Sequence, residues 1–175
     1  MRPSFRRPPI VVAALPLAAC LSQVVPAGAS RADDPGIMAA VDSVIVAIST
    51  ADTALMRRHL APGAVFEARE VPRGRVFSYT DVDVYKGLAS ETTPQLERIW
   101  APRVTREGAT VVVTAPYDFW TAGRFSHCGT DVFRVVAVDG RWRVQRIDYT
   151  IQREGCRPSP LGTPPGMRAQ PTSDA

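Results

Sequence analysis

Residues 110–152 have the sequence TVVVTAPYDFWTAGRFSHCGTDVFRVVAVDGRWRVQRIDYTIQ, in which long runs rich in Val, Ile, Thr and aromatic residues are separated by short breaks. Such runs are typical of β-strands. The breaks are Ala122-Gly123 and Asp139-Gly140, and Asp-Gly between two apolar runs is a strong signal for a two-residue hairpin. The stretch therefore predicts an antiparallel meander, with strands over 110–120, 125–138 and 141–152.

The residues before this meander predict helices and short strands. Apolar residues at helical spacing indicate a helix over 37–49, and Asp34-Pro35 supplies its N-cap and first-turn proline. Two shorter helices are expected over 53–60 and 81–90, each preceded by a capping residue. Short strands are expected over 64–69 and 75–79, and a longer strand over 96–103 begins the strand-rich half of the chain. Helices followed by a strand meander predict an α+β fold, with three helices packed on one face of a curved sheet.

Residues 1–29 have the organisation of a secretion signal. Three arginines among the first seven residues precede an uncharged, mostly apolar run of twelve residues at 10–21. This run is shorter than the ~20 residues that a helix needs to span a bilayer. Ala27-Gly28-Ala29 then has the small-residue pattern that signal peptidase accepts. We therefore expect an exported protein, periplasmic or secreted, whose mature chain begins with a short linker over 30–35.

A second way of processing the leader stays open. Leu17-Ala18-Ala19-Cys20 is similar to the lipobox of bacterial lipoproteins, which is cut before the cysteine. Cys20 would then be acylated, and the acyl chains would hold the protein on a membrane. In the first alternative Cys20 is removed with the leader, so membrane attachment is expected only in the second.

The composition of the 175-residue chain predicts one globular domain. Apolar residues make up 45% of the chain, which is enough for a hydrophobic core, and charged residues make up 22%. The formal net charge of +4 falls to +1 once residues 1–29 are removed, so no nucleic-acid partner is expected. The domain is expected over 36–156. The Pro-rich remainder, 157–175, is expected to be disordered.

Cys128 and Cys156 remain as thiols after either cleavage. An oxidising compartment favours a disulfide between them, and the chain entropy of such a loop corresponds to on the order of 3.5 kcal/mol. Two free buried thiols are the alternative. No metal site is expected, because His59 and His127 are the only histidines and no C-x-x-C spacing occurs. No cofactor is expected either, since no nucleotide-binding or metallohydrolase motif is present.

The two hairpins also place polar residues on the sheet. If both hairpins close at their two-residue turns, Asp118 faces His127 and Asp131 faces Asp148. A carboxylate beside an imidazole can act as a general base or a proton shuttle, and two facing carboxylates raise the pKa of one of them. The same groups can instead satisfy one another as structural cross-strand pairs. One β-bulge would reverse every assignment beyond it.

The candidate catalytic residues are accordingly Asp118, His127 and Asp131. The predicted ligand pocket adds aromatic and polar neighbours, although the tryptophans have the alternative of being core or rim residues. Its full set is Trp100, Asp118, Trp120, His127, Asp131, Phe133 and Asp148.

Several short strings in the strand-rich half are specific enough to compare with known families. They are Tyr117-Asp118-Phe119, GRFSHCG at 123–129, Asp131-Val132-Phe133, Gly140-Arg141-Trp142, Tyr149-Thr150 and Gly155-Cys156. With the order of helices and strands over 36–156, they resemble a bacterial exported subgroup, of unknown function, of the nuclear transport factor 2-like superfamily. The resemblance implies a cone-shaped, strongly curved antiparallel sheet with a pocket under three helices. It also implies homodimers formed through the sheet.

That superfamily contains ketosteroid isomerases, polyketide cyclases, dehydratases and non-catalytic binding domains, so three functions are open. The first, which the sequence favours, is an exported domain that binds a small apolar molecule in a conical cavity. The second is an enzyme of the isomerase, cyclase or dehydratase type that uses Asp118–His127 or Asp131 for proton transfer. The third is an interaction module of the cell envelope. The isomerases' tyrosine and acid pair cannot be matched to residues here, so no catalytic role is carried over.

Overall fold

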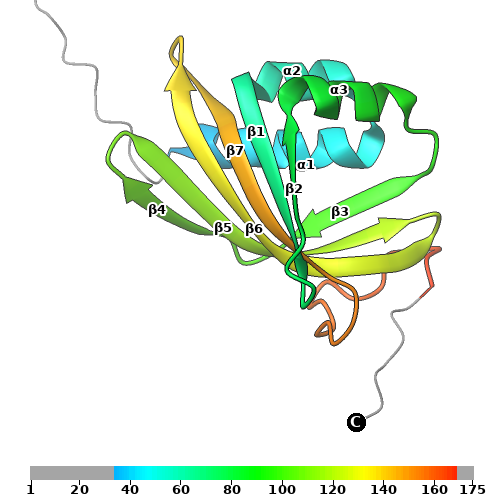
Figure 1. The fold of residues 1–175 in the computed structure, drawn as a ribbon. Helices are drawn as coiled ribbons and strands as arrows, with labels where there is room; N and C mark the ends of the chain where they lie inside the picture. Colours follow the sequence, from blue (N-terminus) through cyan, green and yellow to red (C-terminus); the bar gives the residue numbers. More distant parts are fainter. Residues whose placement is uncertain (1–33, 169–175) are drawn as a thin grey trace, which may run out of the picture.

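A computed structural model describes residues 34–168. The leader expected over 1–29, its two alternative cleavage sites and residues 169–175 lie outside the described residues. Three helices, α1 (Pro35–Thr50), α2 (Thr53–His59) and α3 (Asp81–Ser90), lie on the concave side of a strongly curved sheet (Figure 1). The predicted α+β fold with three helices on one face is therefore confirmed. No helix between residues 34 and 168 is long and apolar enough to cross a membrane.

The sheet has seven strands, which are β1 (Leu60–Val71), β2 (Val76–Thr80), β3 (Gln95–Ile99), β4 (Arg103–Glu107), β5 (Thr110–Thr121), β6 (Arg124–Val138) and β7 (Arg141–Gln152). Their order is β2-β1-β7-β6-β5-β3, and β4 also pairs with β5. The sheet is mixed, because β1 and β7 are parallel where an antiparallel sheet was expected. The strand expected over 96–103 ends early, as β3 at Ile99, because Ala101 takes a positive φ of 44° and Pro102 follows. Beyond this break the chain forms β4, which the sequence did not predict.

The helices begin where their capping residues predict. Asp34 accepts a hydrogen bond of 2.8 Å from a first-turn N–H of α1 and one of 3.0 Å from Nε1 of Trp142, which ties α1 to β7. Asp52 caps α2 in the same way, and Thr80 and Asp83 form a reciprocal capping box on α3. Each cap satisfies backbone N–H groups that have no partner within the helix.

The hydrophobic core lies between the helices and the concave face of the sheet. The apolar stripe of α1 is fully buried at Ile37, Val41 and Val44. Phe133 on β6 and Val144 on β7 belong to the same buried cluster. Alternate residues of each strand face this core, so the other set faces the outer side of the sheet. Toward β3 the inward-facing set becomes more polar, and the candidate site lies there.

The chain after β7 is held against the sheet on the side away from the helices (orange to red in Figure 1). A disulfide joins Cys128 to Cys156, as predicted. Arg98 on β3 then donates a hydrogen bond of 2.8 Å to the carbonyl oxygen of Gly162. Residues 157–168 therefore follow a path fixed by contacts, where their composition predicts disorder. The physical reason is that the disulfide places the start of this segment beside the sheet, within reach of Arg98.

Candidate functional site

A β-bulge in β6 changes the partner of His127. The hairpin pairs as predicted next to its turn, but Ser126 is then an extra residue, so His127 pairs with Phe119 and Asp118 pairs with Cys128. His127 and Phe119 consequently face the helices, whereas Asp118 faces the outer side of the sheet. The predicted Asp118–His127 proton-transfer pair is wrong, because the bulge places its two members on opposite faces.

A second bulge, at Gln145 in β7, separates the two carboxylates that the hairpin was expected to pair. The register shifts there, so Asp131 pairs with Tyr149 and not with Asp148. Asp148 lies on the outer face, where it accepts a hydrogen bond of 2.7 Å from Nε of Arg146. The predicted Asp131–Asp148 pairing is therefore wrong, and Asp148 does not line the cavity under the helices.

Asp118 belongs to a buried ion pair on the outer side of the sheet. Its side chain is 3% exposed and accepts two hydrogen bonds from Arg98, one from Nε at 2.9 Å and one from Nη2 at 2.5 Å. The Arg98 guanidinium also lies 5.6 Å from the centre of the Trp120 ring. Asp118 thus ties β3 to β5 and does not face a ligand in the cavity.

The other predicted pocket residues fall in different places. Phe133 is fully buried in the core, Trp120 is buried on the outer side, and Trp100 lines a separate hollow beside the disulfide. His127 and Asp131 both line the cavity under the helices. The structure therefore brings these two predicted residues together and leaves the remaining ones outside the site.

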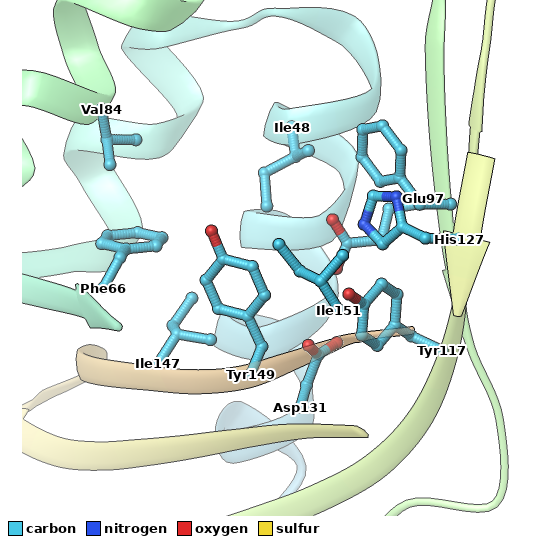
Figure 2. Close-up of a pocket in the computed structure, with 11 residues that line it drawn as sticks. Ile48, Phe66, Val84, Glu97, Tyr117, His127, Asp131, Ile147, Tyr149 and Ile151 are labelled. Carbon is cyan, nitrogen blue, oxygen red and sulfur yellow. The ribbon is translucent and has the colours of Figure 1, made fainter. Parts of the chain in front are cut away.

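A cavity of about 250 Å³ lies between the helices and the concave face of the sheet. Its walls are mostly apolar and aromatic, and its polar side chains gather on one side, where they point into a common space (Figure 2). The lining residues are Ile48, Phe66, Val84, Glu97, Tyr117, Phe119, His127, Asp131, Ile147, Tyr149 and Ile151. An apolar hollow with a few converging polar groups is typical of a small-molecule binding site.

Glu97 and Asp131 form a carboxyl pair in the wall of this cavity. Glu97 is on β3, where its backbone N–H donates a hydrogen bond of 2.9 Å to Oγ of Ser49 on α1. Asp131 is on β6 and is 2% exposed, and none of the described residues donates a hydrogen bond to its buried Oδ2. The two side chains are close enough to share a hydrogen bond when one carboxyl is protonated.

Burial raises the pKa of both carboxyls, because loss of water disfavours the charged form. The pKa of Glu97 rises to about 7, mainly through lost hydration, while the charge of Asp118 adds to the rise and the hydrogen bond with Asp131 opposes it. The pKa of Asp131 rises well above its usual value, through burial first and the charge of Glu97 second. At neutral pH the two carboxyls therefore share a proton.

His127 lines the cavity as a neutral group. Its ring stacks on Phe119 at 4.9 Å between centroids and meets the edge of Tyr117 at 5.7 Å. Burial lowers the pKa of His127 to about 4, with a smaller contribution from the charge of Arg153. Nδ1 lies 3.0 Å from Oγ of Ser126. His127 therefore offers hydrogen bonding near neutral pH, and no charge.

Tyr117 and Tyr149 complete the polar side of the cavity. Burial raises the pKa of both phenols, so their hydroxyl groups stay protonated. The Tyr117 hydroxyl donates a hydrogen bond of 2.8 Å to the carbonyl oxygen of Thr150, which fixes the ring in the cavity wall. Within residues 34–168, no group of three or more His, Cys, Asp or Glu side chains is arranged to hold a metal ion.

Sequence reasoning missed Glu97. It alternates with Leu96 and Arg98 along β3 and shares a face with Ile99, which packs against the core. This alternation is the signal that could have found it. A charged residue in a short strand is ordinarily exposed to solvent. The alternation alone therefore does not indicate that Glu97 lies in a cavity.

Replacing Glu97 with Gln is expected to remove a pH-dependent loss of stability. The carboxyl has a pKa of about 7 in the folded chain against 4.5 ordinarily, so between these values the folded chain keeps a proton that the unfolded chain loses. The wild-type free energy of unfolding should therefore fall as pH rises from 4.5 to 7, by on the order of 3 kcal/mol relative to Glu97→Gln. Urea unfolding across this pH range measures the difference.

A Glu107→Gln variant is the matched control for this experiment. Glu107 forms an exposed ion pair of 2.8 Å with Arg134 on β6, away from the cavity. This variant should follow the wild-type pH profile. Parallel profiles for wild type and Glu97→Gln would show that Glu97 ionises as freely in the folded chain as in the unfolded one.

Comparison with known proteins supports the fold. No family model matches the sequence, and no curated protein matches it. An NTF2-like protein from Cytophaga hutchinsonii is similar in structure, at 15% identity and a TM-score of 0.56, with 66% of this chain and 94% of that chain covered. An NTF2-like superfamily protein from Salmonella enterica matches at 15% identity and a TM-score of 0.54, covering 69% of this chain and 91% of its own.

An NTF2-like protein of unknown function from Shewanella baltica is also similar. It is 19% identical, with a TM-score of 0.50, and the match covers 71% of this chain and 93% of that one. The chain therefore has the nuclear transport factor 2-like fold that the sequence resemblance implies. At these identities the similarity is one of backbone architecture.

Proposed function

We propose that the protein binds a small, mostly apolar molecule in the cavity under α1 and α3, with a polar end of the ligand at Glu97 and Asp131. The observation that carries this proposal is Oδ2 of Asp131, which is buried at the polar side of an otherwise apolar hollow and has no hydrogen-bond donor among the described residues when Asp131 and Glu97 are both ionised. A buried polar atom without a partner is costly, and a ligand that hydrogen-bonds to it removes that cost. The cavity favours this function over an interaction module of the cell envelope.

We also propose that the protein acts outside the cytoplasm. The basic start, apolar run and cleavage pattern of residues 1–29 support export. The Cys128–Cys156 disulfide is compatible with an oxidising compartment. Acylation of Cys20 would keep the exported protein on a membrane.

A second candidate is an enzyme of the isomerase, cyclase or dehydratase type that uses the Glu97–Asp131 pair. The favouring observation is that the pKa of Glu97 is about 7, because a carboxyl with such a pKa can take or give a proton near neutral pH. Turnover distinguishes the candidates. An enzyme of this kind would exchange a hydrogen beside the carbonyl of a bound cyclic ketone for deuterium, whereas a binding protein would release the ketone unchanged.

Binding in the cavity can be mapped by NMR of protein labelled at Ile and Val methyl groups, with toluene and benzyl alcohol as probes. Both probes are expected to shift the methyl signals of Ile48, Val84, Ile147 and Ile151, which line the cavity. The methyl groups of Val46 and Val76 should not move, because these residues are exposed elsewhere on the surface. Saturable shifts confined to the cavity residues would support the proposal.

A filled cavity should not bind the probes. Replacing Ile151 with Trp places a larger side chain in the wall, and we expect the probe-induced shifts at Ile48 and Ile147 to disappear. Val46→Trp is the matched control, since it adds the same side chain at a position that is 48% exposed on α1. Unchanged binding by Ile151→Trp, or no shift at the cavity methyl groups of the wild type, would contradict the proposed function.

A further inference from the structure

The side chains of the cavity lining that can carry a charge near neutral pH are acidic. Glu97 and Asp131 are both acids, and among the described residues that line the cavity there is no Lys or Arg. His127 lines it too, but burial keeps this imidazole neutral. The ionisable groups that face the carboxyl pair from β5, β6 and β7 are therefore Tyr117, His127 and Tyr149, and none of these carries a positive charge near neutral pH.

Two arginines, Arg98 and Arg153, belong to strand β3 and to the chain just after β7, but neither lines the cavity. Arg98 uses Nε and Nη2 on Asp118, on the outer side of the sheet, and Nη2 also bonds the carbonyl oxygen of Gly162. Arg153 lies 3.8 Å from Glu70 and is outside the cavity lining, although its charge helps to lower the pKa of His127. Among the described residues, therefore, no Lys or Arg side chain stands in the cavity lining beside the two carboxyls.

Aromatic rings form the wall next to the carboxyl pair. Phe119 and Tyr117 both contact the His127 ring. Tyr149 stands across the cavity from His127, with its hydroxyl group pointing away from Asp131 toward the side of Ile48 and Phe66 (Figure 2). The faces of aromatic rings attract cations, and the attraction grows when water is excluded. Two acids and several aromatic rings therefore line one cavity, and this combination is complementary in charge to an organic ammonium group.

We infer that the cavity selects a cationic amine with an apolar body, whose ammonium group lies between Glu97 and Asp131 and whose apolar part fills the space lined by Ile48, Val84 and Ile147. The ammonium N–H groups would supply the hydrogen-bond donors that Asp131 Oδ2 lacks. This inference rests on the proposed function, because it specifies the chemistry of the ligand in that same cavity.

Three probes of nearly equal shape test the inference, namely benzylamine, benzyl alcohol and toluene. By titration calorimetry at pH 8, benzylamine should bind the wild-type protein at least about tenfold more tightly than benzyl alcohol. The cation stabilises the ionised carboxyls, so its binding should release a proton, measurable as a dependence of the binding heat on the buffer. Its affinity should increase as pH rises through about 7, where Glu97 loses its proton.

Variants of the two acids test whether the carboxyl pair, and not the apolar part of the cavity, causes the preference for benzylamine. Glu97→Gln and Asp131→Asn should each remove most of the preference for benzylamine and leave toluene affinity within about twofold of wild type. Glu107→Gln removes a carboxylate of an exposed ion pair on β4 and should keep the preference.

The possible results distinguish this inference from the proposed function. If benzyl alcohol binds as tightly as benzylamine, or more tightly, the cavity is a binding site but its selection of a cation is overturned. If all three probes fail to bind, both the inference and the proposed function are overturned. A benzylamine preference that survives Asp131→Asn and Glu97→Gln would show that other groups hold the ammonium, which also overturns the inference.

Discussion

Replacing Arg98 with Met is expected to lower the free energy of unfolding by about 3–5 kcal/mol, because it leaves a buried carboxylate without its partner. The Asp118 side chain is 3% exposed, and both of its oxygens accept hydrogen bonds from the Arg98 guanidinium. The substitution also removes the hydrogen bond to Gly162, so the segment after the disulfide loses its contact with β3. Urea unfolding followed by tryptophan fluorescence measures the loss.

Two further variants show whether the loss comes from the buried charge. Arg134→Met breaks the ion pair with Glu107, whose side chain is 60% exposed, and should cost less than about 1 kcal/mol. The double variant Arg98→Met/Asp118→Leu removes both charges and should recover a large part of the stability lost in the single variant. A loss below about 1 kcal/mol in Arg98→Met would show that Asp118 is hydrated in the folded protein.

Gly129→Ala is expected to cost about 3 kcal/mol or more, through overlap that the surrounding backbone cannot relieve. A Cβ at this position of β6 would overlap the carbonyl oxygen of Thr150 and lie 2.7 Å from Cε1 of Tyr117. The Tyr117 hydroxyl bonds that same carbonyl oxygen, so the ring and the carbonyl would be displaced together. The loss would appear in urea unfolding, and the cavity methyl signals of the folded fraction would shift.

Gly87→Ala on α3 is the matched control for this substitution. Nothing lies within 4 Å of a Cβ built there. Ala is favoured over Gly in a helix by up to about 1 kcal/mol, so this variant should be as stable as wild type or slightly more stable. A Gly129→Ala variant within about 1 kcal/mol of wild type would mean that β6 and β7 are further apart around Thr150 than the structure shows.

The sequence predicts the fold well because the signals for the fold are local. Asp34, Asp52 and Thr80 mark the three helix starts through their own caps. The turns at Ala122-Gly123 and Asp139-Gly140 fix both hairpins, and the strands pair as predicted next to those turns. These features depend on neighbouring residues, so a single sequence contains the information needed.

The candidate site is predicted only in part, because it depends on two β-bulges that the residue types at those positions do not indicate. Neither Ser126 nor Gln145 is a glycine or proline, yet each is the extra residue of a bulge that reverses the faces beyond it. The predicted pairing of Asp118 with His127 is therefore wrong. His127 and Asp131 nevertheless both line the cavity, as predicted. Glu97 is missed because nothing in a single sequence indicates that β3 brings it to Asp131.

The parallel pairing of β1 with β7 has a consequence for how the chain folds. β1 pairs on one side with β2, the next strand in the chain, but its partner on the other side is β7, the last strand. Phe66, for example, lies between Tyr79 of β2 and Ile147 of β7. Loop-closure entropy must be overcome before such distant contacts form, and folds rich in them fold slowly. During synthesis, the helices and the β1–β2 hairpin emerge first and lack the surface on which they pack. The cavity therefore forms only when the final strand is in place, since Ile147, Tyr149 and Ile151 of that strand are part of its wall.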